Sequence, residues 1–155
     1  MNKYIVPIVS ALLVGFLLAK FMIDQYDKKE SLTTVFNKYE TLYFVRQGIY
    51  SSKESMEKNM TDFAYYIYNQ NEDKYYTYIG ITKNEQNLEK LKGFFEKMGY
   101  ITYIEEFTVD SNAFIEILTQ YDNLLLETND ESVIKAICSQ VLSKYEELIL
   151  NEREN

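Results

Sequence analysis

The sequence predicts an α+β protein with one antiparallel sheet built from two strand-and-helix units, and three observations carry this prediction. The chain has 155 residues, of which 46% are hydrophobic and 15% aromatic, enough for one packed core. The phrase "GIYSSKESMEK" at Gly48–Lys58 returns without a gap as "GITKNEQNLEK" at Gly80–Lys90, with the same first and last pairs of residues. Each copy follows a run rich in β-branched and aromatic residues and opens a run with helical spacing, so the repeat is a doubled strand-and-helix unit.

The first element predicted along the chain is a transmembrane helix. Tyr4–Ile23 is apolar and contains one charge, Lys20. A helix of this length rises about 30 Å and crosses the hydrocarbon core of a bilayer. A cleaved signal peptide and a buried core helix are the alternatives. A signal peptide, however, has a shorter apolar region, which is followed by a cleavage site with small residues. Residues 1–23 are therefore interpreted as an uncleaved anchor, whose orientation the flanking lysines do not decide.

The next residues predict a stalk, a strand and a helix. Residues 24–40 are charged and contain Ser and Thr, which favours a short stalk. "TLYFVRQGIY", at Thr41–Tyr50, is typical of a strand. Ser51 or Ser52 can cap the helix that follows, and its apolar face has helical spacing in Met56, Met60 and Phe63.

The second unit repeats this pattern after a hairpin. Two aromatic runs surround the polar residues Asn69–Asp73, a pattern typical of a β-hairpin. Asn84 then caps a helix that Gly99 ends in the left-handed conformation. The apolar face of this helix contains Leu88, Leu91 and Phe95, and "YITYIEEFTV" is the last strand.

The resulting order, βαββαβ over residues 41–109, is that of ferredoxin-like and RNA-recognition (RNP-like) folds. In this plan two helices cover one face of a four-stranded antiparallel sheet and leave the other face open. Function is expected on the open face.

Residues 110–155 predict a C-terminal helical hairpin. Two apolar stripes, in residues 112–126 and 133–150, are separated by the polar link "ETNDES". The stripes either close on each other and on the domain or remain free to bind a partner.

Composition bounds the function further. The formal net charge is −8, and all 24 acidic residues follow the apolar segment, so a nucleic-acid partner is not expected. The chain has no histidine and one cysteine, Cys138, interpreted as a small core residue. The sequence contains neither a nucleophile–base pair nor a phosphate-binding glycine loop, so we expect no enzyme, no metal and no cofactor.

Two stretches, "VRQGIYSSKESMEKNM" and "TYIGITKNEQNLEKLKGFFEKMGYITYI", resemble the two halves of the SPOR domain, the sporulation-related repeat. In that family a strand leads to a glycine, a polar cap and a helix with an apolar-Glu-Lys phrase. The resemblance covers about residues 43–109 and implies the βαββαβ fold. It also implies that the ligand is peptidoglycan, as glycan strands stripped of their stem peptides, at sites of cell division or spore formation.

Candidate binding residues follow from strand alternation. If Tyr75, Thr77 and Ile79 face the helices, the opposite side of the sheet shows aromatic rings with cationic neighbours, which can contact sugar faces and hydroxyls. The residues predicted on that side are Phe44, Arg46, Lys74, Tyr76 and Tyr78. The resemblance adds Ile49 and Ile104. The alternative is that these tyrosines are ordinary strand residues or form the surface against which the C-terminal helices pack.

The apolar segment predicts a single span in the cell membrane, and the resemblance implies a non-catalytic, glycan-binding protein with its soluble part outside the cytoplasm. The alternative is a scaffold that recruits a division or sporulation protein through the sheet face or the C-terminal hairpin, without binding glycan.

Overall fold

The computed structural model describes Gly15 and residues 39–150. The chain divides into two compact units, Met1–Phe36 and Asn37–Asn155. Apart from Gly15, Tyr39 and Glu40, the predicted anchor and stalk lie outside the described residues. Within the described part, no helix combines the length and the apolar character that a membrane span requires.

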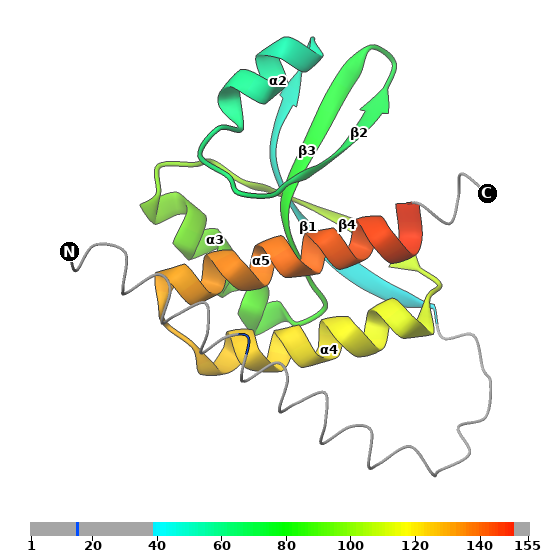
Figure 1. Cartoon of the computed structure of the whole chain (residues 1–155), viewed down its shortest axis with the longest axis vertical. Coiled ribbons are helices and arrows are strands. Elements are labelled where there is room, and N and C mark those ends of the chain that lie inside the picture. The colour runs from blue at the N-terminus through cyan, green and yellow to red at the C-terminus, as the bar shows by residue number, and fades with distance from the viewer. Residues whose placement is uncertain (1–14, 16–38, 151–155) are drawn as a thin grey trace. The chain divides into compact units, whose positions relative to one another are not determined.

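The described part of the second unit is an α+β structure with a four-stranded antiparallel sheet (Figure 1). Along the chain, the first six elements follow the predicted order: strand, helix, strand, strand, helix, strand. The strands lie in the order β2-β3-β1-β4 across the sheet. The elements are β1 (Glu40–Tyr50), α2 (Lys53–Asn59), β2 (Ile67–Asn71), β3 (Lys74–Thr82), α3 (Glu85–Lys97), β4 (Tyr103–Val109), α4 (Asn112–Glu127), α5 (Glu131–Tyr145) and the π-helix η1 (Glu146–Leu150).

The helices begin at polar caps, because a side-chain oxygen can accept a hydrogen bond from an otherwise unpaired N–H of the first turn. Ser52, one of the two serines predicted as caps, caps α2, and Asn84 caps α3 as predicted. Ser111 and Asp130 cap α4 and α5 in the same way. At the end of α3, Gly99 has φ +90°, which confirms the predicted left-handed residue.

A β-bulge changes which side chains share a face of the sheet. Val45 on β1 pairs with Gly80 on β3, but the next β1 residue, Arg46, pairs with Tyr78, so Ile79 is the extra residue. The bulge places Tyr78 on the same face as Phe44, and their ring centroids lie 5.7 Å apart. In contrast, β1 and β4 pair in an uninterrupted register.

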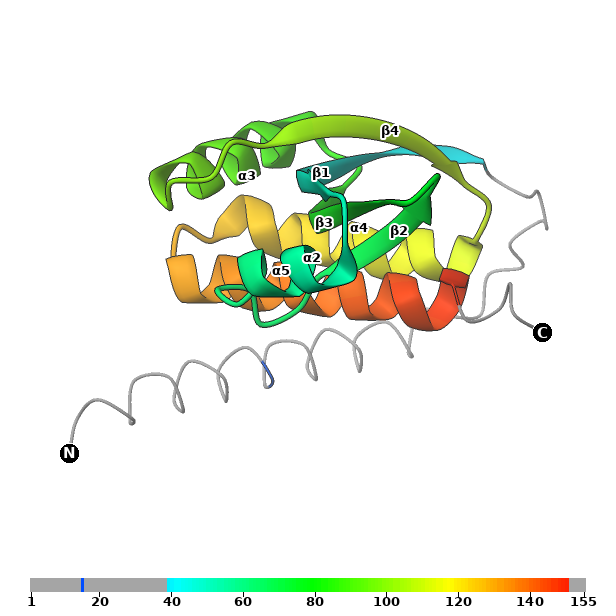
Figure 2. The same ribbon diagram turned by 90° about the horizontal axis from the view of Figure 1, so that it is seen from above.

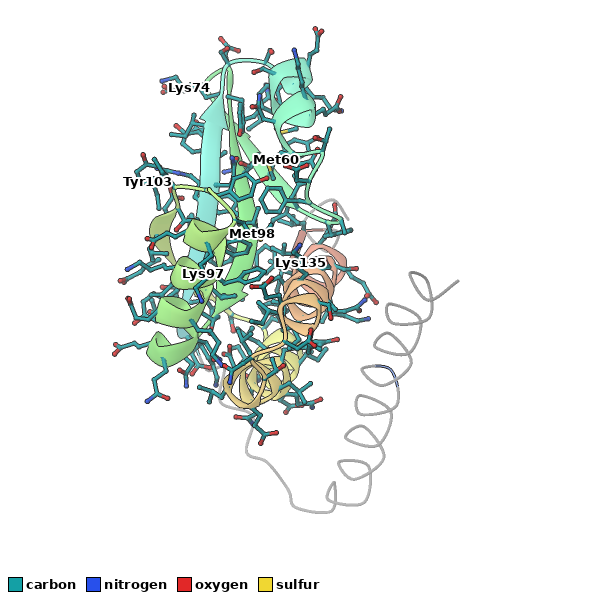
Figure 3. All side chains as sticks on the ribbon, turned by 90° about the vertical axis from the view of Figure 1, so that its left-hand side faces the viewer. Met60, Lys74, Lys97, Met98, Tyr103 and Lys135 are labelled. Carbon is teal, nitrogen blue, oxygen red and sulfur yellow. The ribbon has the colours of Figure 1, made fainter. Side chains whose placement is uncertain are left out.

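The C-terminal helices complete the core of the domain. Helices α4 and α5 contact each other, and α5 contacts β3 (Figures 1 and 3). Strand β2 pairs with Lys74–Tyr78 of β3, and α5 lies near Gly80, in the part of β3 beyond this pairing. A Cβ atom at Gly80 would lie 3.3 Å from Cδ1 of Leu91 on α3 and 3.8 Å from Sγ of Cys138 on α5. Of the two alternatives for the apolar stripes, the structure therefore has the one in which they close on each other and on the domain.

The core combines residues of the sheet, of α2, of α3 and of the C-terminal helices. Its least exposed members, each at 2% or less, include Leu42, Val45, Met56, Ile79, Leu91, Phe114, Leu118 and Leu142. Cys138 is buried as predicted, and burial raises the pKa of its thiol to about 12.

Candidate binding face

The sheet face that contains Phe44, Arg46, Tyr76 and Tyr78 consists of a covered half and an open half. The covered half contains Phe44, Tyr78 and Phe107, and the open half contains Arg46, Ile49, Tyr76 and Tyr103. Cross-strand pairs put these side chains on one face: Phe107 faces Leu42, Tyr103 faces Arg46, and Tyr76 faces Ile49.

In the covered half the Phe44 ring packs against the C-terminal helices and against Phe107, which itself stays 39% exposed. The Phe44 ring lies 4.9 Å from that of Phe107 and 5.1 Å from that of Tyr145, at the end of α5. Tyr145 in turn contacts Phe114 of α4, with 5.2 Å between ring centroids. All these contacts are edge-to-face, the arrangement that aromatic pairs favour.

Two of the predicted binding residues lie on the predicted face but are buried there. Phe44 is 2% exposed and Tyr78 is 5% exposed, so neither lies on an open surface. The physical reason is that the end of α5 and the start of α4 bury additional apolar area here. The Phe44 ring packs against Tyr145 of α5, and Tyr78 contacts the rings of Phe44 and Phe107 beside it.

A groove of about 210 Å³ remains beside the covered half. The rings of Tyr78, Phe107 and Tyr145 line it together with Leu150 of η1. Its other lining residues are Phe44, Ile67, Tyr68, Asn69 and Thr108.

Arg46 is the centre of the open half. Its guanidinium carbon lies 5.0 Å from the ring centroid of Tyr103 and 5.8 Å from that of Tyr76, within the range of cation–π attraction. Arg46 also forms an ion pair with Glu105 on β4. The partner carboxylate neutralises the positive charge, so this half of the face presents aromatic surface rather than a free cation.

Glu105 links the two halves of the face. One carboxylate oxygen bonds Arg46, and the other accepts a hydrogen bond from the Tyr78 hydroxyl at 2.7 Å. Burial, together with this hydrogen bond, raises the pKa of Tyr78. Tyr78 therefore stays a neutral donor at physiological pH.

The open half brings together most of the remaining predicted residues. Ile49 is 45% exposed and faces the half-buried Tyr76 across the sheet. Lys74 is exposed two residues before Tyr76 on β3 (Figure 3). Ile104, which the resemblance adds, does not lie beside them, because it pairs with Val45 and therefore points to the opposite face of the sheet.

Sequence reasoning missed Tyr103 and Glu105. Tyr103, which is 53% exposed, faces Arg46 directly in the β1–β4 register. Alternation along the last strand makes Tyr103, Glu105 and Phe107 neighbours on one face. The register that sets them beside Arg46 could not be read from that alternation alone.

The geometry supports non-covalent binding. The exposed ring of Tyr103 and the half-buried ring of Tyr76 lie beside a fixed guanidinium, an arrangement that suits a ligand with apolar faces and hydroxyl groups. Among the described residues, no group of three His, Cys, Asp or Glu residues is arranged to hold a metal ion.

Comparison with known proteins identifies no relative from which a function could be transferred: no protein-family model matches the chain, and searches of curated proteins and of solved structures found no match.

Proposed function

We propose that this protein is a membrane-tethered, non-catalytic peptidoglycan-binding protein that acts in cell division or sporulation. Its ligand is glycan strand stripped of stem peptides. The observation that carries the proposal is the open half of the sheet face, where the rings of Tyr76 and Tyr103 flank Arg46. In this proposal residues 1–23 are the anchor, and the soluble part lies outside the cytoplasm.

The proposed fold within residues 41–109 is the ferredoxin/RNP-like one of the SPOR domain, with α2 and α3 on the same face. The order of elements and the strand order β2-β3-β1-β4 support it. The two glycines of the sequence repeat, Gly48 and Gly80, also lie on the neighbouring strands β1 and β3.

The contacts proposed for the glycan are mainly aromatic, with one cationic hydrogen-bond donor. The rings of Tyr76 and Tyr103 lie against the apolar faces of sugar rings, and Ile49 extends this surface. Lys74 donates hydrogen bonds to hydroxyl or acetamide oxygens. Because Glu105 already pairs with Arg46, a carboxylate on the ligand is not needed for binding.

Tyr76 and Tyr78 provide a matched test, since they lie on one strand and one face but in different halves. Tyr76→Ala removes a ligand contact without opening a core cavity, so the free energy of unfolding should change by about 0.5 kcal/mol or less. Loss of a central aromatic contact costs about 2 kcal/mol of binding, or roughly thirtyfold. The measurement is retention of the full chain, in neutral detergent, on purified wall sacculi treated with amidase, alongside a thermal melt.

The control variant, Tyr78→Ala, should give the opposite result. It removes a buried ring and should lower the free energy of unfolding by about 3 kcal/mol or more, with normal retention per folded molecule. Unchanged retention of Tyr76→Ala would show that the open half does not bind glycan.

The scaffold function is the second candidate, and the covered half of the face favours it. The C-terminal helices cover Phe44, which strand alternation predicts on the glycan-binding side of the sheet. If wild-type protein is not retained on sacculi, with or without amidase treatment, the glycan proposal fails and the scaffold remains.

The proposed location has a separate test. Asn123 is exposed on α4, so a cysteine there should react with a membrane-impermeant thiol reagent once Cys138 is replaced by alanine. Labelling in intact cells is the expected result. Labelling only after lysis would place the domain in the cytoplasm and remove its access to the wall.

A further inference from the structure

Strand β4 forms an open edge of the sheet. It pairs with β1 on one side through all of its residues, Tyr103–Val109, without a bulge. Within the described part of the chain, no strand pairs with its other side, and Figure 2 shows β4 along the outer margin of the sheet. The backbone N–H and C=O groups on that side can therefore accept a further strand.

This edge lacks most of the features that protect sheet edges. Such edges are usually short, bulged, or marked by lysine or proline. The opposite edge, β2, fits this description, because it is five residues long and exposes Asn69, Gln70 and Asn71. In contrast, β4 is regular, contains neither Lys nor Pro, and exposes apolar side chains at Tyr103 (53%) and Phe107 (39%).

The charges along β4 indicate which partner fits. Glu105 is engaged by Arg46 and Tyr78, whereas Glu106 is an exposed carboxylate on the opposite face of the strand. No lysine or arginine occurs between Lys97 and Lys135, so the strand and the start of α4 form an acidic segment. A basic strand would place its cations beside Glu106, and opposite charges across strands are stabilising.

A second copy of this chain fits the edge poorly. In the antiparallel register that pairs all of β4 with β4 of another copy, Glu106 would face Glu106. Like charges directly opposite each other destabilise a strand pair.

We propose that β4 binds an extended basic peptide segment of another protein as an additional strand. The segment alternates apolar and basic residues, with the apolar side chains beside Tyr103 and Phe107 and the basic ones beside Glu106. The contact uses the backbone edge of the sheet, so it goes beyond glycan binding and does not depend on it.

The probe for this proposal is the capped peptide VKVKVKV, titrated against the full chain in neutral detergent. Fluorescence anisotropy gives the dissociation constant, and amide NMR shifts locate the contact. We expect saturable binding with the largest shifts in Tyr103–Val109. Glu106→Lys should weaken binding of this peptide by roughly three- to tenfold and should strengthen binding of VEVEVEV.

Two controls separate strand addition from general attraction to an acidic protein. Glu96→Lys makes the same charge change on an exposed position of α3 and should leave the affinity nearly unchanged. An N-methylated VKVKVKV keeps its charge but loses backbone N–H donors, and it should not bind. Equal weakening by both protein variants, or equal binding of the N-methylated peptide, would overturn the proposal. Self-association of the wild-type chain through β4 would also overturn it, in favour of a second copy.

Discussion

Asp122 is a buried residue of α4 whose hydrogen bonds connect this helix to the end of β3 and the start of α3. It is 4% exposed and accepts hydrogen bonds from the Thr82 hydroxyl, from the Lys83 N–H at 3.0 Å and from Asn87 Nδ2 at 3.0 Å. Desolvation by burial raises the pKa of its carboxyl, and the hydrogen bonds only partly offset this effect. The folded state therefore binds a proton at Asp122 more tightly than the unfolded state.

The raised pKa predicts a pH dependence of stability with a defined sign. Between neutral pH and the ordinary carboxyl value of 3.8, the folded state carries more of this proton, so acidification should stabilise it. Asp122→Asn cannot titrate. Because it loses an acceptor, its free energy of unfolding should be lower at every pH. Urea unfolding should therefore be measured at several pH values. The free energy of unfolding of the wild type should exceed that of Asp122→Asn by a larger margin as the pH falls. A gap that shrinks on acidification would mean that the pKa is lowered instead.

Individual polar residues show what sequence alone could not predict. Asp122 is one of 24 acidic residues and nothing in its neighbours distinguishes it, because Thr82 and Asn87 reach it only in the folded chain. Arg46 was correctly identified as a residue of the candidate face. Its neutralisation by Glu105 depends on the β1–β4 register, which amino-acid patterns do not fix.

At the scale of elements, the β2–β3 hairpin has an unfavourable turn sequence. Its two loop residues, Glu72 and Asp73, have φ values of +49° and +63°. Two positive φ angles in a two-residue loop are typical of a type I′ turn, which favours Asn followed by Gly.

The double substitution Glu72→Asn with Asp73→Gly should therefore stabilise the protein. Asn and Gly adopt positive φ angles at a lower energetic cost than Glu and Asp. The double substitution should therefore add about 0.5 to 1 kcal/mol to the free energy of unfolding. The measurement is the urea midpoint at constant m-value. As a control, Glu57→Asn on the exposed surface of α2 should not raise the midpoint, since it lowers helix propensity. An unchanged midpoint for the double variant would show that the turn is not strained.

The elements themselves were largely predictable, but their alignment was not. The Ser52 and Asn84 caps, Gly99 and the polar hairpin loop are local signals, and the structure has each of them. The bulge at Ile79 has no local signal, because it reflects how β1 and β3 fit together. This bulge keeps Tyr78 on the face of Phe44, where the end of α5 buries both.

For the whole molecule, the sequence predicts the order of the first six elements and places a boundary after residue 109, and α5 contacts β3 across that position. Residues 37–155 form one compact unit. Apolar periodicity shows that α4 and α5 must be buried, but it does not show which surface buries them. They bury half of the face that strand alternation leaves open.

This arrangement predicts that a chain ending at Val109 does not fold cooperatively. Truncation there removes Phe114, Leu118 and Leu142, which are fully buried, and it exposes Phe44 to water. Each lost large apolar side chain corresponds to about 2 kcal/mol or more, and a domain's net stability is only about 5 to 15 kcal/mol. The thermal melt of the truncated chain, followed by near-ultraviolet circular dichroism, should lack a sharp transition.

A chain ending at Leu150 keeps every described contact and should melt like the full chain. If the shorter chain melted cooperatively near the wild-type temperature, residues 41–109 would be an autonomous domain and the C-terminal helices a detachable cover. In that case removal of the helices would enlarge the open half of the face, and retention on sacculi should increase.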